Sequence, residues 1–208
     1  MQPTDVWDLP TRLFHWALAA FVFLALATGE DEGIVFYIHA AAGHGVLALL
    51  AFRLVWGAIG SPRSRFADFI RPASVVRAYL GDLVRLRPPS HVGHNPLGGW
   101  MIVLLLAASG AAAGTGILVL DYAFLEGLHE GLANFLIFLI AIHVGGVLVD
   151  GLLTGDNLIR AMFTGRKNLA PDRAAAEKPL APRWLGIALL IGAAVLWIWL
   201  VGTTRAPA

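Results

Sequence analysis

The sequence predicts an all-α integral membrane protein, built as a four-helix transmembrane bundle with a fifth C-terminal transmembrane helix. Three observations lead to this fold class. Of the 208 residues, 58% are hydrophobic and only 14% are charged, and the mean hydropathy is +0.72, whereas about 25% of the residues of a soluble domain are charged. Five apolar stretches approach or exceed the length of about 20 residues that a helix needs to cross a bilayer. The charges are concentrated between these stretches.

We expect membrane-spanning helices at about residues 12–29, 35–59, 97–120, 127–150 and 183–201. The small residues near the end of the first stretch resemble the cleavage site of a signal peptide. However, Asp5 and Asp8 precede this stretch with a single cation, Arg12, and a histidine lies within it. We therefore interpret it as a retained span.

The expected domain organisation is a core, a linker and an added helix. Residues 1–168 form the four-helix core, 169–182 a polar cytoplasmic linker with alanines and prolines, and 183–208 the fifth helix with a short outer tail. Within the core, apolar residues recur at helical spacing over about residues 72–87, with arginines between them. This pattern predicts an amphipathic helix that lies on the membrane surface.

The loops between the spans differ in charge. Loops 30–33 and 121–130 are acidic and define what we call the acidic end, whereas loops 60–96 and 150–183 are rich in arginine and lysine and define the arginine-rich end. Cationic loops stay on the cytoplasmic side of a membrane. We therefore expect a multi-pass protein of the bacterial inner membrane, with its N-terminus in the cytoplasm and its C-terminus in the periplasm.

Seven histidines stand out in so apolar a chain, which contains no cysteine. The absence of cysteine excludes a disulfide framework, thiolate-held zinc, iron–sulfur clusters and a covalently attached c-type haem. A histidine inside a membrane needs a strong compensating interaction. Any cofactor must therefore be held by nitrogen or oxygen ligands, for which histidine is the obvious source.

Four of the histidines are expected at two depths. His129 and His143 share one face of the fourth span, because 14 residues correspond to a rise of about 21 Å and to directions within about 40° of each other. His39 lies near the acidic end and His15 near the arginine-rich end. The pairs His39/His129 and His15/His143 predict two stacked haem b groups, each with its iron held by two imidazoles. A zinc ion would need further ligands at one depth.

His44 is the alternative to His39 as the outer ligand. It lies five residues further along the second span, so it points about 140° away and lies about 7.5 Å deeper. Only one of the two can face His129, and we favour His39 because its depth matches. The other role for His44 is a hydrogen bond to a haem edge or to another helix.

Four polar residues at the arginine-rich end have two interpretations each. Arg12 and Arg53 are placed to pair with haem propionates, or to extend toward lipid phosphate. His91 and His94 belong to a solvated loop, or they contact a quinone or a propionate.

Small and aromatic residues are less specific. Gly110 and Gly114 allow close approach, either of a porphyrin or of a neighbouring helix. Tryptophans cluster near span ends, as interfacial anchors do; they include Trp7, Trp16, Trp56 and Trp100.

Several motifs are recognisable along the chain. They are Val6 to Trp16 (VWDLPTRLFHW), Ile38-His39 fourteen residues before Arg53, Gly93 to Trp100 (GHNPLGGW), His129-Glu130 with His143, Asp156 to Met162 (DNLIRAM) and Thr164 to Lys167. Together they resemble the bacterial cytochrome b561 family, which includes the b-type cytochrome subunit of nickel–iron hydrogenases. The resemblance covers about residues 5–168.

The resemblance implies a core that binds two b haems through His15, His39, His129 and His143, and that passes electrons between an outer-face partner and the quinone pool. We therefore expect an electron-transfer subunit of a quinone-linked oxidoreductase rather than a stand-alone enzyme, with no catalytic side chain of its own. The expected partners are membrane lipid, a quinone and a c-type cytochrome, hydrogenase or dehydrogenase subunit. We expect no nucleic-acid partner. The sequence leaves open whether the protein forms a homodimer.

Two alternatives remain at this point. The first is a self-sufficient superoxide:quinone oxidoreductase, although the acidic outer loops would repel an anion. The second is a haem-free transporter or assembly protein with histidines that relay protons. Such a protein should carry ionisable groups near the midplane, whereas the middles of the first, third and fifth spans hold no charge.

Overall fold

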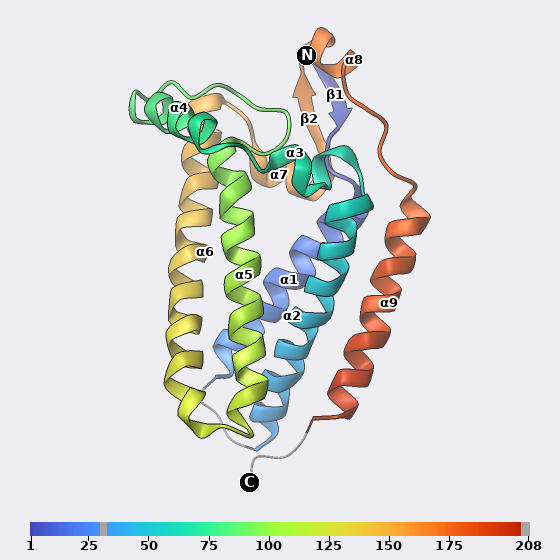
Figure 1. Ribbon diagram of the computed structural model, residues 1–208. Helices are drawn as coiled ribbons and strands as arrows, with labels where there is room; N and C mark the ends of the chain where they lie inside the picture. Colours follow the sequence, from blue (N-terminus) through green and yellow to red (C-terminus); the bar gives the residue numbers. More distant parts are fainter. Residues whose placement is uncertain (30–32, 205–208) are drawn as a thin grey trace.

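Five long helices dominate the structure, a computed structural model that describes residues 1–29 and 33–204 (Figure 1). They are α1 (Leu9–Ala27), α2 (Ile34–Ile59), α5 (Pro96–Val119), α6 (Glu126–Thr154) and α9 (Arg183–Gly202). Each is long and apolar enough to cross a membrane. The predicted all-α integral membrane fold with five spans is thereby confirmed.

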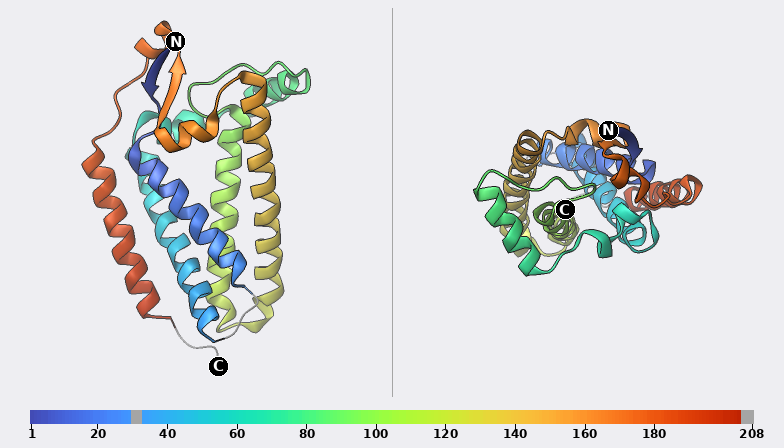
Figure 2. Two further views of the ribbon diagram at one scale, coloured as in Figure 1. Left: turned by 180° about the vertical axis from the view of Figure 1, so that it is seen from behind. Right: turned by 90° about the horizontal axis from the view of Figure 1, so that it is seen from above.

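Helices α1, α2, α5 and α6 form the bundle, and α9 packs on its outside against α2 and, less extensively, α1 (Figures 1 and 2). The four-helix interior centres on a cluster of apolar side chains contributed by all four helices, Val22, Val46, Ala108, Leu136 and Leu139. A second apolar cluster joins α9 to α1 and α2, and consists of Phe14, Leu49, Phe52, Trp56 and Ala193.

Single residues at the caps set the helix ends, which hydropathy alone places a few residues away. Helix α1 begins at Leu9 because the Asp8 carboxylate accepts a hydrogen bond from Thr11 N at 2.6 Å and Pro10 occupies the first turn. Helix α6 continues to Thr154 and stops at Gly155, whose φ of 75° suits a residue without a side chain. The predicted span 127–150 therefore ends one turn too early.

Short elements cover the arginine-rich end of the bundle. They are η1 (Pro62–Ser64), α3 (Phe66–Phe69), α4 (Ala73–Val84), α7 (Leu158–Thr164) and α8 (Pro171–Ala175), while η2 (Ala123–Leu125) lies at the acidic end. Helix α4 is the predicted amphipathic helix. Its Tyr79 is buried, whereas apolar residues such as Val84 remain exposed, which suits a helix at a membrane surface.

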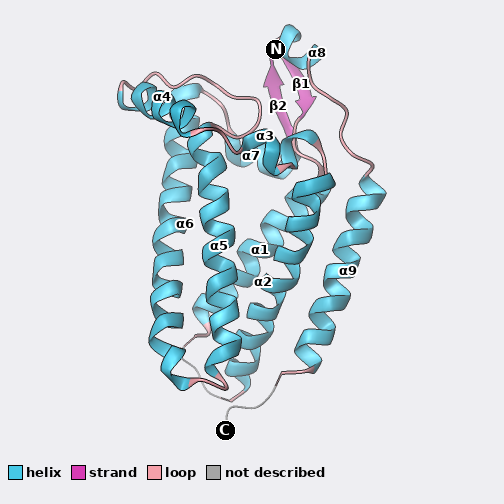
Figure 3. Cartoon of the chain, viewed as in Figure 1, coloured by secondary structure: helices cyan, strands magenta, loops and turns pink. Residues whose placement is uncertain are grey.

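A two-stranded antiparallel ribbon joins the start of the chain to the end of the core, drawn in magenta in Figure 3. Strand β1 (Gln2–Asp5) pairs with β2 (Arg166–Leu169), with Gln2 opposite Leu169 and Asp5 opposite Arg166. The all-α expectation does not include this ribbon. Four-residue segments so far apart in the sequence carry no periodicity that could indicate their pairing.

The stretch expected to be a linker is attached to the bundle. It contains α8, its Glu177 forms an ion pair with Arg63, and Ala181 N donates to Ser61 Oγ at 3.0 Å. Two of the tryptophans expected at the interface are instead inside the protein. Trp56 is fully buried and Trp7 is 7% exposed.

Candidate functional site

Two histidines face each other near the acidic end, one from α2 and one from α6. The ring centres of His39 and His129 are 6.0 Å apart, with the ring planes perpendicular. His39 Nδ1 lies 2.9 Å from Ala25 O, and His129 Nδ1 lies 3.0 Å from Ala112 O. A carbonyl oxygen only accepts, so each Nδ1 carries the proton. The Nε2 lone pair of each ring is then available for a metal.

A second pair lies near the arginine-rich end, between α1 and α6. The ring centres of His15 and His143 are 6.5 Å apart, with the planes at 52°. His15 Nδ1 is buried and finds no hydrogen-bond partner in the described part of the chain. Trp16 lies edge-on against His15, with ring centres 4.8 Å apart, and stacks on Phe163. The structure thus brings together both predicted pairs, one in the first turn of α6 and the other 14 residues further along this helix.

The spacing of both pairs fits a single metal atom between two imidazoles. Two in-line bonds of about 2.0 Å from ring nitrogens to a metal require ring centres on the order of 6 Å apart. Among the described residues, no group of three or more His, Cys, Asp or Glu side chains is placed to hold a metal ion. A donor set of two neutral imidazoles fits a haem iron, which receives its other ligands from the porphyrin.

Glycines lie next to these histidines along α2 and α6, and another lies opposite His129 on α5. Gly43 lies one turn after His39, and Gly146 nearly one turn after His143. A Cβ at either glycine would meet no atom of the described chain within 4 Å. Gly116 has a different role, because a Cβ there would lie 3.0 Å from His129 Cε1. Its missing side chain lets the imidazole approach α5.

Gly110 and Gly114, for which the sequence allows close approach either of a porphyrin or of a neighbouring helix, have different surroundings. A Cβ at Gly110 would contact Leu50 Cδ1 at 3.3 Å, so this glycine serves helix packing. A Cβ at Gly114 would contact nothing within 4 Å among the residues described. Gly114 therefore faces open space and does not serve helix packing.

His44 is not part of either pair. It is 8% exposed and lies against the end of α9, where Thr204 Oγ1 is 3.3 Å from its Nδ1. It therefore makes the contact with another helix that was one of its two predicted roles.

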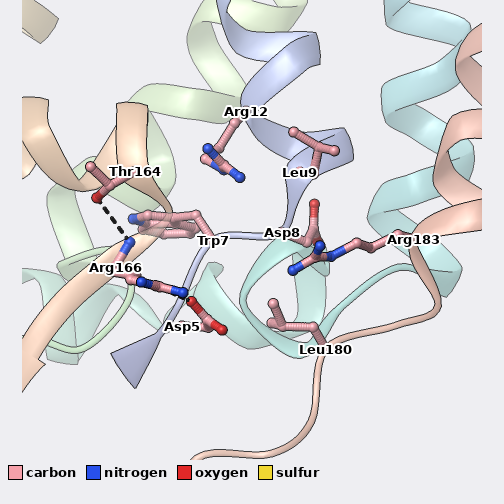
Figure 4. A pocket seen from close by; sticks show the side chains of 9 residues that line it. All are labelled: Asp5, Trp7, Asp8, Leu9, Arg12, Thr164, Arg166, Leu180 and Arg183. Atoms are coloured by element: carbon pink, nitrogen blue, oxygen red, sulfur yellow. Dashed lines mark hydrogen bonds and ion pairs between the residues drawn. The ribbon is translucent and has the colours of Figure 1, made fainter. Parts of the chain in front are cut away.

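Arg53 and Arg12 differ in how many interactions their guanidinium groups make within the protein. Arg53 is 3% exposed, donates to Ser64 O at 2.9 Å, and stacks over Phe66 with 4.8 Å from its guanidinium carbon to the ring centre. Arg12 donates to Phe163 O, but its buried Nε has no partner among the residues in the structure's described ranges. Arg12 also lines a pocket of about 160 Å³ at the arginine-rich end (Figure 4).

His94 is a functional candidate in the loop before α5, and the sequence alone leaves its role open. Its ring is held between Trp7 and Phe69, with ring centres 4.5 and 5.0 Å away. Burial, and then the positive charge of Arg53, lower the pKa of His94 to about 3. It is therefore neutral at neutral pH. No local signal predicts this, because its neighbours come from distant parts of the chain.

The acidic end carries exposed carboxylates. Glu126 and Glu130 are both exposed. The acidic residues 30–32 lie outside the described residues. Glu130 therefore belongs to the surface and not to the histidine pair beside it.

Comparisons with known proteins identify a family and a relative that are similar to this chain. The model of a family described as prokaryotic cytochrome b561 matches residues 6–165. A probable Ni/Fe-hydrogenase B-type cytochrome subunit from Rhizobium leguminosarum bv. viciae is 24% identical over 222 residues, which cover 83% of this chain and 91% of that protein. No solved structure matches the chain. The matched region contains α1, α2, α5 and α6 in full and ends before α9.

Proposed function

This chain belongs to the prokaryotic cytochrome b561 family and is a membrane b-type cytochrome that functions in electron transfer, and we propose on this basis that it binds two haem b groups. We propose further that it passes electrons between a redox partner at the acidic end and the quinone pool. We place it in the bacterial inner membrane with the arginine-rich end in the cytoplasm, since cationic loops remain on that side. The C-terminus would then lie in the periplasm.

We propose His39 and His129 as the axial ligands at the acidic end, and His15 and His143 as those at the arginine-rich end. This assignment rests on two imidazole pairs, each spaced for one iron, that lie at different depths of the bundle. A bound haem supplies one-electron redox chemistry, with a potential that depends on its axial ligands and on the surrounding hydrogen bonds and burial.

The chain's own residues orient these ligands and balance the charge of the propionates. The carbonyls of Ala25 and Ala112 fix the tautomers of the acidic-end imidazoles. The free Nε of Arg12 suits a propionate oxygen. Arg53 is already bound to Ser64 and to aromatic rings, so we propose that it contributes positive charge without a direct contact.

The partner at the acidic end must be a separate protein, since a chain without cysteine cannot attach a c-type haem. We propose a c-type cytochrome, a dehydrogenase or a hydrogenase, the last supported by the relative described as a probable hydrogenase cytochrome subunit. The exposed Glu126 and Glu130 suit a basic docking surface. They would repel superoxide, so no observation favours a stand-alone superoxide oxidase.

A reduced-minus-oxidised absorbance spectrum of the purified protein tests the cofactor. We expect b-type bands and a ratio of two haems per chain in the pyridine haemochrome assay. A spectrum without haem bands would contradict the proposal and would favour the haem-free transporter or assembly protein.

Substitution of the two α2 histidines tests the ligand assignment. His39→Ala should abolish the haem at the acidic end and leave one haem per chain, because the iron loses an axial ligand. His44→Ala is the matched control, five residues along the same helix, and should retain both haems. Loss of a haem in His44→Ala but not in His39→Ala would overturn the pairing.

A further inference from the structure

Three side chains from distant parts of the sequence meet at the arginine-rich end: Tyr79 of α4, Asp150 of the last turns of α6 and His91 of the loop before α5. The Tyr79 hydroxyl donates to Asp150 Oδ1 at 2.5 Å. The Tyr79 ring lies edge-on against the His91 imidazole, with ring centres 5.5 Å apart. Tyr79 is 4% exposed, whereas Asp150 is partly exposed. The cluster therefore joins the surface of the protein to its interior.

Charges from three elements, α6, β2 and α8, act on this cluster. Burial, with the hydrogen bond to Asp150 and its negative charge, raises the pKa of Tyr79, so the hydroxyl keeps its proton. Burial lowers the pKa of His91; a backbone hydrogen bond and Asp150 oppose this shift, while Lys167 of β2 and Arg173 of α8 add to it. His91 is therefore neutral at neutral pH, and a neutral imidazole can accept a proton at one nitrogen and release one from the other.

His91 also borders a cavity of about 310 Å³, whose polar lining residues include Arg63, Asp68, Arg71, His91 and His94. The buried Nδ1 atoms of His91 and His94 have no hydrogen-bond partner in the ranges that the structure describes. His94 lies near enough to His15 and His143 to interact electrostatically with both. The cavity thus borders His91 of the cluster and also His94, which interacts electrostatically with the arginine-rich histidine pair.

Two polar contacts hold His91 in this position. Lys167 Nζ donates to the His91 carbonyl at 2.7 Å and forms an ion pair with Asp156 at 2.8 Å. Ser90 Oγ donates to the same carboxylate at 3.0 Å. The loop is therefore fixed on both sides of the imidazole.

We propose that Asp150, Tyr79 and His91 form a proton path from the aqueous surface at the arginine-rich end to the cavity lined by His91 and His94, where a quinone gains or loses its protons. This inference rests on the proposed function, because it needs a quinone that exchanges electrons with the protein. Asp150 takes a proton from solvent, Tyr79 holds the carboxylate in place, and His91 passes the proton toward the cavity.

The reaction balances in both directions. A quinone that becomes a quinol takes up two electrons and two protons, and an O–H bond forms on each carbonyl oxygen. The electrons come from the reduced partner at the acidic end, which is oxidised. The protons come from water through Asp150 and His91, which return to their starting protonation states. Oxidation of a quinol releases the same electrons and protons in reverse.

Reoxidation of the dithionite-reduced holoprotein by decylubiquinone tests the path, with haem absorbance as the measure of rate. Asp150→Asn keeps an oxygen for the Tyr79 hydroxyl but cannot carry a proton, and it should slow reoxidation at least tenfold. Tyr79→Phe should slow it severalfold. Asp82→Asn is the matched control, since Asp82 is an exposed carboxylate of α4 paired with Arg85; its rate should equal that of the wild type.

Two further measurements separate proton transfer from a structural role. Added imidazole should restore the rate of Asp150→Asn by carrying protons to the cavity. Redox-difference infrared spectra of the wild type should show a carboxyl C=O band that Asp150→Asn lacks. If Asp150→Asn loses its haem, the proton path is tested by the two remaining measurements. A carboxyl C=O band in the wild-type infrared spectrum and slower reoxidation in Tyr79→Phe would support the path, and the absence of both would overturn it.

The outcomes also distinguish this inference from the function on which it rests. Equal rates in the wild type and Asp150→Asn would overturn the proton path and leave the electron-transfer function standing. A slow Asp150→Asn variant without rescue by imidazole and without a lost infrared band would also overturn it. A wild-type haem that decylubiquinone does not reoxidise would instead contradict the proposed exchange with quinone.

Discussion

At the scale of single residues, a backbone carbonyl decides which nitrogen of an imidazole is free. Ala25 O and Ala112 O hold the Nδ1 protons of His39 and His129, whereas His15 Nδ1 has no such partner among the residues the structure describes. A hydrogen bond of this kind makes an imidazole a more basic ligand. The two proposed haem sites should therefore differ in reduction potential.

Gly116→Ala should weaken haem binding at the acidic end. The added Cβ would lie 3.0 Å from His129 Cε1 and would displace the imidazole from its carbonyl partner. We expect a loss of haem affinity of about tenfold, as for other disturbed ligand-orienting contacts, seen as a lower haem-to-protein ratio after gel filtration.

Gly192→Ala is the control for this substitution. A Cβ at Gly192 of α9 would meet no atom of the described chain within 4 Å, and both changes replace a helical glycine by alanine. If the two variants keep the same amount of haem, the contact between Gly116 and His129 does not position the ligand.

The sequence predicted that the histidines of each pair face each other because one helix carries most of the information. The spacing of His129 and His143 along α6 places both on one face, and their partners follow from depth. The burial of His94 could not be predicted, for the opposite reason. Its surroundings come from Trp7 before α1 and Phe69 of α3, so its burial depends on packing between segments that no local pattern connects.

At the scale of elements, the length of an apolar stretch predicts that a helix exists but not where it ends. All five spans and the surface helix α4 were predicted from hydropathy and periodicity. The ends depend on single residues, such as Asp8 before α1 and Gly155 after α6. The ribbon of β1 and β2 depends on tertiary packing and could not be predicted.

Asp8→Ala should destabilise the bundle more than any change at its exposed neighbour Asp5. The buried Asp8 carboxylate caps α1 and accepts hydrogen bonds from Ser64 Oγ at 2.7 Å and Trp56 Nε1 at 3.3 Å. Loss of the cap and of these acceptors should cost about 3 kcal/mol. The measurement is the free energy of unfolding in detergent.

Asp5→Ala serves as the matched control, three residues earlier in the chain. Asp5 is half exposed and paired with Arg166 at 2.9 Å, and such a pair contributes less than about 1 kcal/mol. Equal losses of stability in the two variants would show that the buried network around Asp8 does not hold the start of α1.

At the scale of the whole molecule, the proposed cofactor sites belong to four helices and α9 is an addition to their side. Both histidine pairs lie on α1, α2 and α6, while α9 contacts the bundle through residues such as Trp197, whose Nε1 donates to Ala41 O at 2.8 Å. The family match also ends before α9. We therefore expect α9 to affect stability more than haem binding.

Gly186→Val should separate these two properties. A side chain at Gly186 would collide with Pro10 of α1 and press on the Trp56 ring. We expect a loss of about 2 kcal/mol in the free energy of unfolding, with an unchanged haem spectrum.

Gly192→Val, on the same helix but without neighbours within 4 Å in the described chain, should leave both properties unchanged. If Gly186→Val loses haem while Gly192→Val does not, the helix takes part in forming the cofactor sites.

The β1–β2 ribbon has a consequence for how the protein is made. Its first strand is translated before the residues of α1, α2, α5 and α6, and its second strand only after them. The two strands can pair only if both are on the same side of the bilayer, which requires an even number of completed crossings between them. The ribbon therefore closes only after all four helices of the bundle have been translated, and only when the number of them that cross the bilayer is even.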